Sequence, residues 1–377
     1  MKNYQPASFR IILSVILVLI SLSFSNQKKG KIAYTMKVNG SEVVVCPVNK
    51  VTDTIDLRLS SLLESCEIIK LQNTPEALFD GAWHTVISDK YICIKPYGQQ
   101  PAKLYDKKGM FLRNIGKLGR GPGEYQTLNG LQFNPKGDML FLFPFATTRK
   151  ILVYDVSGKQ LKDIPLACTQ RKFKAFFSAD SVVTVLSMPF PGDSAICFTQ
   201  DFQGKLIRKV PPPDYLINKS FDGEVFTNYL TPEYDLYNTA ADTLYHYNIS
   251  RNKLEPKFTK DFGGRKVVTA SREIPGYYYF WFRGENISGN ILVNQKTLDA
   301  KYFRLKNDYF GNIAASPVFS NGYFINSVAA ITLKKQIAAE LKRKDISAGD
   351  KQKLIEFDKN LKEDDNNIIF YGKLKKI

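Results

Sequence analysis

The sequence has few of the residues that build common catalytic and metal sites. It contains only two histidines, His84 and His246, among 377 residues, which excludes a site made of several histidines. Its five cysteines include no Cys-x-x-Cys pair, which argues against a zinc or thioredoxin-like site. No Gly-x-Ser-x-Gly elbow, His-Glu-x-x-His motif or EF-hand calcium loop occurs. We therefore predict no metal and no cofactor, and we expect both histidines to belong to the framework.

The sequence also lacks an apolar run of membrane-spanning length. Its longest run, Ile11 to Phe24, covers 14 residues, whereas a spanning helix takes about 20. Lys2 and Arg10 precede this run and small serines follow it, which is the pattern of a secretory signal peptide. We predict that residues 1–25 are a signal peptide cleaved near Ser25–Asn26, with an uncleaved anchor helix as the alternative. The mature chain would then be periplasmic or extracellular and would not span a membrane.

Acidic residues are scarce relative to basic ones. Lys and Arg number 53 against 36 Asp and Glu, and loss of Lys2 and Arg10 with the signal peptide lowers the net charge from +17 to about +15. Export and the lack of a basic–aromatic module argue against nucleic acid as a partner. We expect an envelope protein, a peptide or an anionic glycan instead. Oxidising conditions would also permit one disulfide, Cys46 with Cys66.

Aromatic residues are abundant, and they occur within a repeat. An apolar pair, a Tyr or Asp and a short polar turn, with Gly in the clearer copies, recur in units that start at positions 104, 152, 198, 244 and 292, which are 48, 46, 46 and 48 residues apart. Four short strands per unit of this length are typical of a propeller blade. In Tyr277–Phe282, odd and even positions point to opposite sheet faces. We predict that both faces are packed, as blades require, and keep a sugar-stacking platform as the alternative.

The two ends of the chain supply the sixth blade in this prediction. Residues 367–375 form a strand-like run, as does the segment that starts at Cys66. Pairing them within one blade would close the ring and remove exposed edges. Residues 327–363 follow helical spacing and break at Ser347–Asp350, a capping-box pattern. We predict an all-β, six-bladed propeller over residues 66–377, with a helical insertion at 327–363 and a lead-in segment at 26–65.

One loop links the sequence to a known family. Residues 119–125 read Gly-Arg-Gly-Pro-Gly-Glu-Tyr, and Asn134-Pro-Lys-Gly137 follows. With these motifs the chain resembles an NHL-type repeat. More closely, it resembles over about residues 42–377 the secreted bacterial six-bladed β-propeller proteins with NHL-like or TolB-like repeats. Pro144 stands roughly where NHL repeats often carry Asp, so an NHL role in RNA or partner binding is not carried over. The resemblance implies the fold and no defined activity.

The candidate ligand residues lie on loops that share one face of such a propeller. Loops between blades and loops between second and third strands lie on the same side, where a central channel opens. For each arginine among the candidates listed below, the alternative role is an ion pair between blades. Gly119, Gly121, Pro122 and Gly123 are assigned to the backbone of a loop. The candidates are Tyr97, Gln99, Arg120, Glu124, Tyr125, Arg149, Arg283, Glu285 and Asn286.

Three functions remain open from the sequence. The first is an exported binding or scaffold protein that engages a glycan, peptide or envelope protein through its loop face. The second is a lyase or hydrolase with a site at the channel mouth. The third is a structural subunit that docks through the helices at 327–363. Fold alone does not decide among them, because function depends on individual sites.

Overall fold

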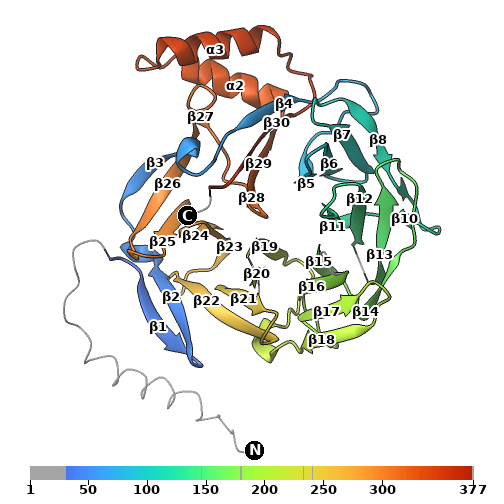
Figure 1. Ribbon diagram of the computed structural model, residues 1–377. Helices are drawn as coiled ribbons and strands as arrows, with labels where there is room; N and C mark the ends of the chain where they lie inside the picture. The colour runs from blue at the N-terminus through green and yellow to red at the C-terminus, as the bar shows by residue number, and fades with distance from the viewer. Residues whose placement is uncertain (1–30, 146, 179–180, 232, 240, 376–377) are drawn as a thin grey trace, which may run out of the picture.

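The computed structural model describes residues 31–375, except residues 146, 179, 180, 232 and 240. In this part of the chain the main strands form six sheets around a central axis, so the protein is the six-bladed β-propeller that the repeat predicts (Figure 1). The predicted signal peptide lies outside the described residues. No helix of the described part is long and apolar enough to cross a membrane.

Each blade is built from four strands that run antiparallel to their neighbours, in order from the channel outward. Blade 1 contains β5 (Ala82–Ile87), β6 (Tyr91–Pro96), β7 (Ala102–Asp106) and β8 (Phe111–Ile115). Blade 2 contains β11 (Leu128–Phe133), β12 (Met139–Pro144), β13 (Thr148–Asp155) and β14 (Ile164–Gln170). Blade 3 contains β15 (Lys172–Phe177), β16 (Val182–Met188), β17 (Cys197–Asp201) and β18 (Leu206–Val210).

The second half of the ring follows the same plan. Blade 4 contains β19 (Val225–Thr231), β20 (Glu233–Asn238), β21 (Thr243–Asn248) and β22 (Lys253–Asp261). Blade 5 contains β23 (Val267–Ile274), β24 (Tyr277–Gly284), β25 (Ile287–Asn294) and β26 (Ala300–Asn307), with β27 (Ile313–Ala314) added at its outer edge. Blade 6 contains β28 (Phe319–Ser320), β29 (Tyr323–Val328), β30 (Ile368–Lys373) and β4 (Glu67–Lys70).

The repeated sequence pattern corresponds to the turn between the two outer strands of a blade. In the first three copies, the carboxylate of Asp106, Asp155 or Asp201 accepts from the N–H four residues later, at 2.9, 3.0 and 2.8 Å. The glycine three residues after each Asp has φ of +87°, +82° and +83°. This backbone conformation favours glycine. In the two weaker copies Asn replaces Asp, and Asn252 and Leu298 take the left-handed position with φ of +49° and +59°.

The strands bury both faces, which confirms the predicted packing of Tyr277–Phe282. Tyr278, Phe280 and Phe282 lie in the core between blades 4 and 5. Tyr277, Tyr279 and Trp281 pack against the core between blades 5 and 6. Large aromatic side chains fill the wedge between neighbouring sheets and bury much apolar area. This packing explains the excess of Phe and Tyr in the sequence.

Both ends of the chain close the ring, as predicted. β30 pairs antiparallel with β4, in the register Ile368↔Lys70 and Ile369↔Ile69. The outermost strand of blade 6 therefore comes from the N-terminal part of the chain, whereas the strands inside it come from the C-terminal part (Figure 1). This pairing removes the free edges that an open ring would present.

The lead-in segment also forms strands on the outside of the ring. β1 (Tyr34–Val38) and β2 (Ser41–Pro47) form a hairpin, and β2 pairs in parallel with β22 of blade 4. β3 (Thr54–Arg58) then pairs in parallel with β26 of blade 5. Before it enters blade 6 as β4, the N-terminal segment thus runs along the outer edges of blades 4 and 5 (Figure 1).

The predicted helical insertion lies between β29 and β30. It consists of α2 (Ala330–Leu341) and α3 (Ala348–Lys359), at the outside of the ring (Figure 1). Ser347 caps α3, since its Oγ accepts from the N–H of Asp350 at 3.1 Å. Leu333, Ile337 and Leu354 are fully buried in the core that blades 5 and 6 share. These apolar positions hold the helix pair against the propeller.

The predicted Cys46–Cys66 disulfide is wrong. All five cysteines are free thiols. Cys46 lies in β2 beside blade 4, and Cys66 precedes β4 of blade 6, so the path of the lead-in segment separates them by a whole blade.

Candidate functional site

The innermost strands enclose a cavity of about 490 Å³ at the centre of the ring. Its walls include residues of β5, β11, β15, β19, β23 and β29, so every blade contributes. Both tryptophans of the chain line it. The charged lining residues are Lys174, Arg272 and Glu224, beside His84. A cavity of this size with mixed aromatic and polar walls is typical of a small-molecule site.

Lys174 extends from β15 of blade 3 toward blade 2. Its Nζ donates to the carbonyl oxygen of Asn129 at 2.5 Å, and the Asn129 side chain donates to the carbonyl oxygen of Phe173 at 2.8 Å. Burial lowers the pKa of Lys174 to about 8, an effect that Glu224 opposes and Arg272 reinforces. The ammonium is therefore mostly charged at neutral pH, and only one of its three donors is used by a hydrogen bond to the described residues.

A glycine on β11 makes room for this lysine. A Cβ atom at Gly130 would lie 3.3 Å from Nζ of Lys174 and 3.4 Å from Nδ1 of His84. Contacts this close would require the neighbouring groups to shift by a few tenths of an ångström. Gly130 thus lets side chains from blades 1 and 3 reach the same point of blade 2.

His84 has the framework role expected for it. Its Nδ1 accepts from the backbone N–H of Leu131 at 3.2 Å, which links β5 to β11. Burial, together with the nearby cations Lys174 and Arg272, lowers the pKa of His84 to about 3. The imidazole is neutral at physiological pH and adds no charge to the cavity.

Arg272 supplies the second cation. It extends from β23 of blade 5, donates to the carbonyl oxygen of Phe319 in blade 6 and lies 5.6 Å from the ring centroid of Phe226 in blade 4. Burial lowers its pKa, but an arginine side chain stays protonated in proteins. Inside a wall of low dielectric, each fixed charge exerts a stronger potential than at the surface.

Two exposed aromatic rings stand at the channel wall of blade 1. Trp83 is 43% exposed and Tyr97 is 57% exposed. Their ring centroids are 5.5 Å apart, with the planes at 75°. The N–H of Tyr97 donates to the carbonyl oxygen of Gly81 at 2.8 Å, which fixes the backbone at this loop. The pair therefore presents large apolar surfaces to solvent from a defined position.

Three of the sequence-based candidates line hollows at the channel mouth. Tyr97 and Gln99 line a hollow of about 520 Å³ between blades 1 and 2. Arg283 lines another, of about 530 Å³, between blades 5 and 6. The structure thus places these three on the predicted face, at two separate points of the rim.

The Gly119–Tyr125 loop is built from internal contacts. It is flanked by the short parallel strands β9 (Lys117–Leu118) and β10 (Glu124–Tyr125). Glu124 accepts from the N–H of Gly121 at 2.8 Å. Tyr125 is buried, since its hydroxyl donates to the carbonyl oxygen of Ile115 and accepts from the N–H of Ala102. Tyr125 therefore faces the core, and Gly123 has φ of +73°, a backbone conformation that favours glycine.

The remaining candidates lie apart from the cavity walls. Arg120 is exposed, and its guanidinium donates to the Gln126 side chain at 3.1 Å when the amide oxygen faces it. Arg149 is exposed and donates to Oγ1 of Thr169 at 2.8 Å. Glu285 and Asn286 form the exposed β24–β25 turn, where Asn286 has φ of 58°. The structure does not bring these four residues together.

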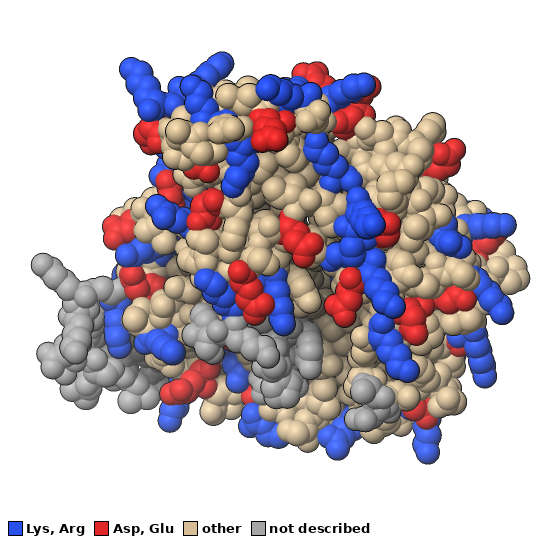
Figure 2. Space-filling view, turned by 45° about the horizontal axis from the view of Figure 1, so that its top comes forward, with Lys and Arg blue, Asp and Glu red and all other residues tan. Residues whose placement is uncertain are grey.

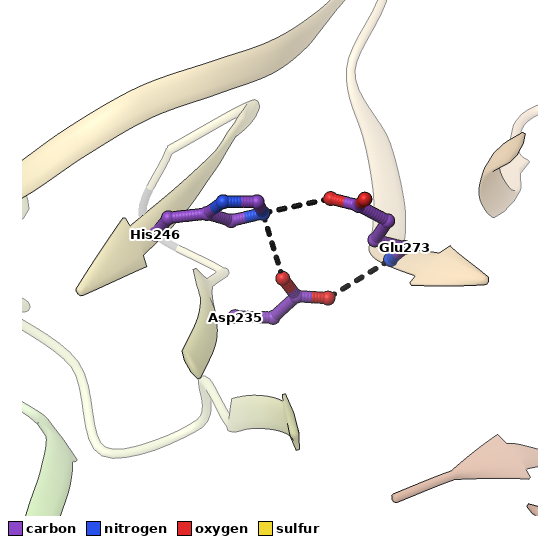
Figure 3. A group of neighbouring side chains, drawn as sticks. All are labelled: Asp235, His246 and Glu273. Atoms are coloured by element: carbon purple, nitrogen blue, oxygen red, sulfur yellow. Dashed lines mark hydrogen bonds and ion pairs between the residues drawn. The ribbon is translucent and has the colours of Figure 1, made fainter. Parts of the chain in front are cut away.

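A second group of ionisable residues joins blades 4 and 5. Nε2 of His246 on β21 lies 2.9 Å from Oδ1 of Asp235 on β20 and 2.8 Å from Oε2 of Glu273 on β23 (Figure 3). The N–H of Glu273 also donates to Oδ2 of Asp235 at 2.9 Å. Burial alone would lower the pKa of His246, but the two carboxylates outweigh it and raise this pKa to about 10. The imidazolium therefore bridges both blades.

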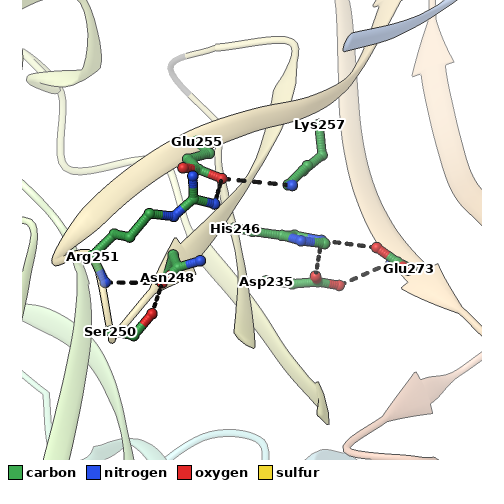
Figure 4. A network of polar contacts seen from close by, with 8 residues as sticks. All are labelled: Asp235, His246, Asn248, Ser250, Arg251, Glu255, Lys257 and Glu273. Carbon is green, nitrogen blue, oxygen red and sulfur yellow. Dashed lines mark hydrogen bonds and ion pairs between the residues drawn. The ribbon is translucent and has the colours of Figure 1, made fainter. Parts of the chain in front are cut away.

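This Asp235–His246–Glu273 triad is the set of described residues whose ligand atoms converge closely enough to hold a metal ion, all within 4.8 Å of one another. In the present arrangement the imidazolium lies between the carboxylates and supplies their counter-charge. A separate set of ion pairs lies nearby, where Glu255 accepts from Arg251 at 3.0 Å and lies 3.6 Å from Lys257 (Figure 4). The triad thus acts as an ion bridge between blades 4 and 5.

Sequence reasoning missed the residues at the centre of the channel. Trp83, Lys174 and Arg272 each lie in the first strand of a blade, and Trp281 lies in a second strand. The signal that could have identified the two cations is a lysine or arginine within the otherwise apolar first strand of a blade, because that strand faces the channel.

The fold and the central cavity define a β-propeller with a site of ligand size at its axis. The family model described as "Domain of unknown function (DUF4934)" matches residues 42–373, and the chain belongs to this family. No protein of curated function matches the chain.

Among solved structures, one has a similar fold over most of this chain, and two others show weaker similarity. A Bacteroides fragilis protein provisionally named as exported has a TM-score of 0.61 and 16% identity, covering 86% of this chain and 99% of that one. Hydrazine synthase of Kuenenia stuttgartiensis has a TM-score of 0.42 and 9% identity, covering 57% and 65%. Virginiamycin B lyase of Staphylococcus aureus has a TM-score of 0.40 and 11% identity, covering 63% and 73%. At 16% identity the similarity to the Bacteroides fragilis protein concerns the fold alone.

Proposed function

We propose that this protein is an exported binding protein that takes an anionic ligand into the mouth of its central channel. One observation carries the proposal: among the described residues that line the central cavity, Lys174 and Arg272 are accompanied by one carboxylate, Glu224, while His84 is neutral. Two cations in a partly enclosed site of low dielectric attract an anion strongly.

The charge of the whole chain supports an anionic ligand. The net charge is +17, and Figure 2 shows basic side chains, with acidic ones among them, over one face of the molecule. A basic surface raises the local concentration of anions and speeds their encounter, although salt screens the effect beyond about 10 Å. The surface charge therefore assists the approach, whereas the cavity determines the binding.

Export is supported by two features. The N-terminal segment has the basic, apolar and small-residue regions of a signal peptide. The Bacteroides fragilis protein of similar fold is also provisionally named as exported. An envelope location brings the channel into contact with glycans, peptides and envelope proteins and keeps it from nucleic acid.

Tryptophan fluorescence tests the proposal directly, since both tryptophans line the cavity. We expect carboxylated or sulfated sugars to change the emission and neutral sugars of equal size to leave it unchanged. Lys174→Met should weaken binding roughly 10- to 100-fold, because hydrogen bonds to charged groups contribute about 1.5–3 kcal/mol. Lys37→Met, on the exposed strand β1, is the matched control. Equal binding of neutral and acidic sugars would refute the proposal.

A second candidate, a lyase or hydrolase at the channel mouth, has one observation in its favour. Burial lowers the pKa of Lys174 to about 8, which is close to the range in which a lysine serves as a general base. Mass spectrometry of a bound sugar after prolonged incubation distinguishes the two functions. An unchanged mass supports binding alone, whereas cleavage that Lys174→Met abolishes supports catalysis.

A further inference from the structure

The central cavity does not stand alone, because two neighbouring hollows share its walls. The hollow between blades 1 and 2 shares Trp83 and Tyr97 with it. The hollow between blades 5 and 6 shares Arg272, Trp281 and Val318. The three hollows, of about 520, 490 and 530 Å³, therefore follow one another across the ring. We call this row of three adjoining hollows the axial groove.

The chemistry of the axial groove changes along its length. Its middle holds the two cations Lys174 and Arg272. A tryptophan stands at each boundary, Trp83 on one side and Trp281 on the other. Each outer hollow adds one further cation beside neutral amides and hydroxyls: Lys95 lies with Gln99, Gln126 and Asn129 at one end, and Arg283 lies with Ser288 and Asn290 at the other.

Some polar groups of the axial groove have unused hydrogen-bonding capacity. Oδ1 of Asn129 and Oγ of Ser327 are buried and have no hydrogen-bond partner among the described residues. Asn129 lines the hollow between blades 1 and 2, and Ser327 lines the central cavity. Buried polar atoms are nearly always satisfied, but both of these atoms are closed to solvent, so a ligand hydroxyl would reach them only after the neighbouring side chains move.

We infer that the ligand is a linear acidic oligosaccharide, which lies along the axial groove with an acidic sugar over the channel. This inference rests on the proposed function. Flat aromatic surfaces beside neutral amides fit the apolar faces and hydroxyls of sugar rings, and the central cations fit a carboxylate or sulfate group. Each hollow alone has the volume of a small-molecule site. A single small anion would fill one of them, whereas a chain occupies all three.

The inference predicts that affinity depends on chain length. We would titrate the full chain with oligogalacturonates and with heparin-derived oligosaccharides, from one sugar unit to six, and follow tryptophan emission. Affinity for at least one series should rise at least tenfold from the monomer to the hexamer. Poly-glutamate peptides of equal charge and neutral maltohexaose should bind at least tenfold more weakly than that hexamer.

Gln99→Ala separates the groove from the central site, because Gln99 lines the hollow between blades 1 and 2 and is not part of the wall of the central cavity. The substitution should weaken hexamer binding about 2- to 10-fold and change monomer binding less than twofold, because one neutral hydrogen bond contributes about 0.5–1.5 kcal/mol. Gln203→Ala, an exposed glutamine on the β17–β18 turn, is the matched control. Its hexamer affinity should equal that of the wild type, and melting curves confirm that both variants fold.

The two levels of the proposal fail in different ways. Equal affinity for monomer and hexamer, or tighter binding of poly-glutamate, would overturn the oligosaccharide inference and leave the anion-binding function standing. Absence of binding by both acidic series, with the monomers included, would overturn both.

Discussion

At the scale of single residues, the two histidines show how the environment sets charge. His84 faces Lys174 and Arg272, and burial with these cations lowers its pKa to about 3. His246 faces Asp235 and Glu273, which raise its pKa to about 10 against the effect of burial. The same side chain is thus a neutral acceptor in the channel wall and a cation between blades 4 and 5.

The His246 bridge should make the free energy of unfolding decrease as the pH becomes alkaline. Because the folded-state pKa of His246 lies above the unfolded value of 6.5, its contribution is complete below about pH 6.5 and is lost as pH rises toward 10. His246→Gln should lower the free energy of unfolding by about 3–5 kcal/mol at pH 6, since it leaves buried carboxylates without their counter-charge. Urea denaturation at pH 6, 8 and 10 should show this difference shrinking.

His84→Gln is the control for this titration. His84 is neutral throughout pH 6–10, because its folded-state pKa is about 3. The stability difference between His84→Gln and the wild type should therefore grow by about 1 kcal/mol or less from pH 6 to pH 8, as the unfolded-state histidine of pKa 6.5 loses its proton, and stay constant from pH 8 to pH 10. A difference for His246→Gln that stays constant from pH 6 to pH 10 would contradict a charged bridge.

At the scale of the element, the turn between the two outer strands of a blade could be predicted from the sequence, because the residues that form it are close together in the chain. The Asp carboxylate and the left-handed glycine both act within five residues, so the pattern repeats visibly along the chain. The inner strands carry no comparable local pattern. They are packed on both faces, and their alternation does not show which polar side chain faces the channel.

A pair of glycines with the same φ tests the turn. Gly109 and Gly192 both have φ of +87°. A Cβ at Gly109 would collide with the carbonyl oxygen of Lys70 in β4, whereas a Cβ at Gly192 would meet open space. Gly192→Ala should cost about 1–2 kcal/mol for the left-handed conformation alone. Gly109→Ala should cost about 1–3 kcal/mol more, since it also overpacks the closing strand.

Equilibrium urea unfolding of both glycine variants measures this difference. The sign of this difference is informative, because both variants share the cost of the left-handed conformation. A larger loss for Gly109→Ala is therefore due to the collision with the backbone of β4. Equal destabilisation would show that the turn of blade 1 does not rest on the backbone of β4.

At the scale of the whole molecule, the ring determines what the sequence could and could not predict. Period, blade number and the pairing of residues 367–375 with the strand after Cys66 follow from patterns along the chain. The central site does not, since Lys174 and Arg272 are 98 positions apart and meet only because six blades curve around one axis. The shared position of Tyr97, Gln99 and Arg283 at the rim could be predicted, because loops at one end of the strands lie on the same face.

Two truncations distinguish the strand pairing that closes the ring, β4 with β30, from the strands β1 and β2, which lie along its outer edge. A chain that starts at residue 51 loses β1 and β2, together with buried Cys46 and Val48, but keeps β4. We expect it to fold with a lower melting temperature, because only the strands at the outer edge of blade 4 are removed.

A chain that starts at residue 72 also loses β3 and β4, which exposes the edge of β30 and the fully buried Ile369. An open hydrophobic edge favours association between molecules, so this chain should lose its cooperative transition and aggregate in size-exclusion chromatography. If both truncated chains instead melt cooperatively at the same temperature, the pairing of β4 with β30 does not hold the ring together.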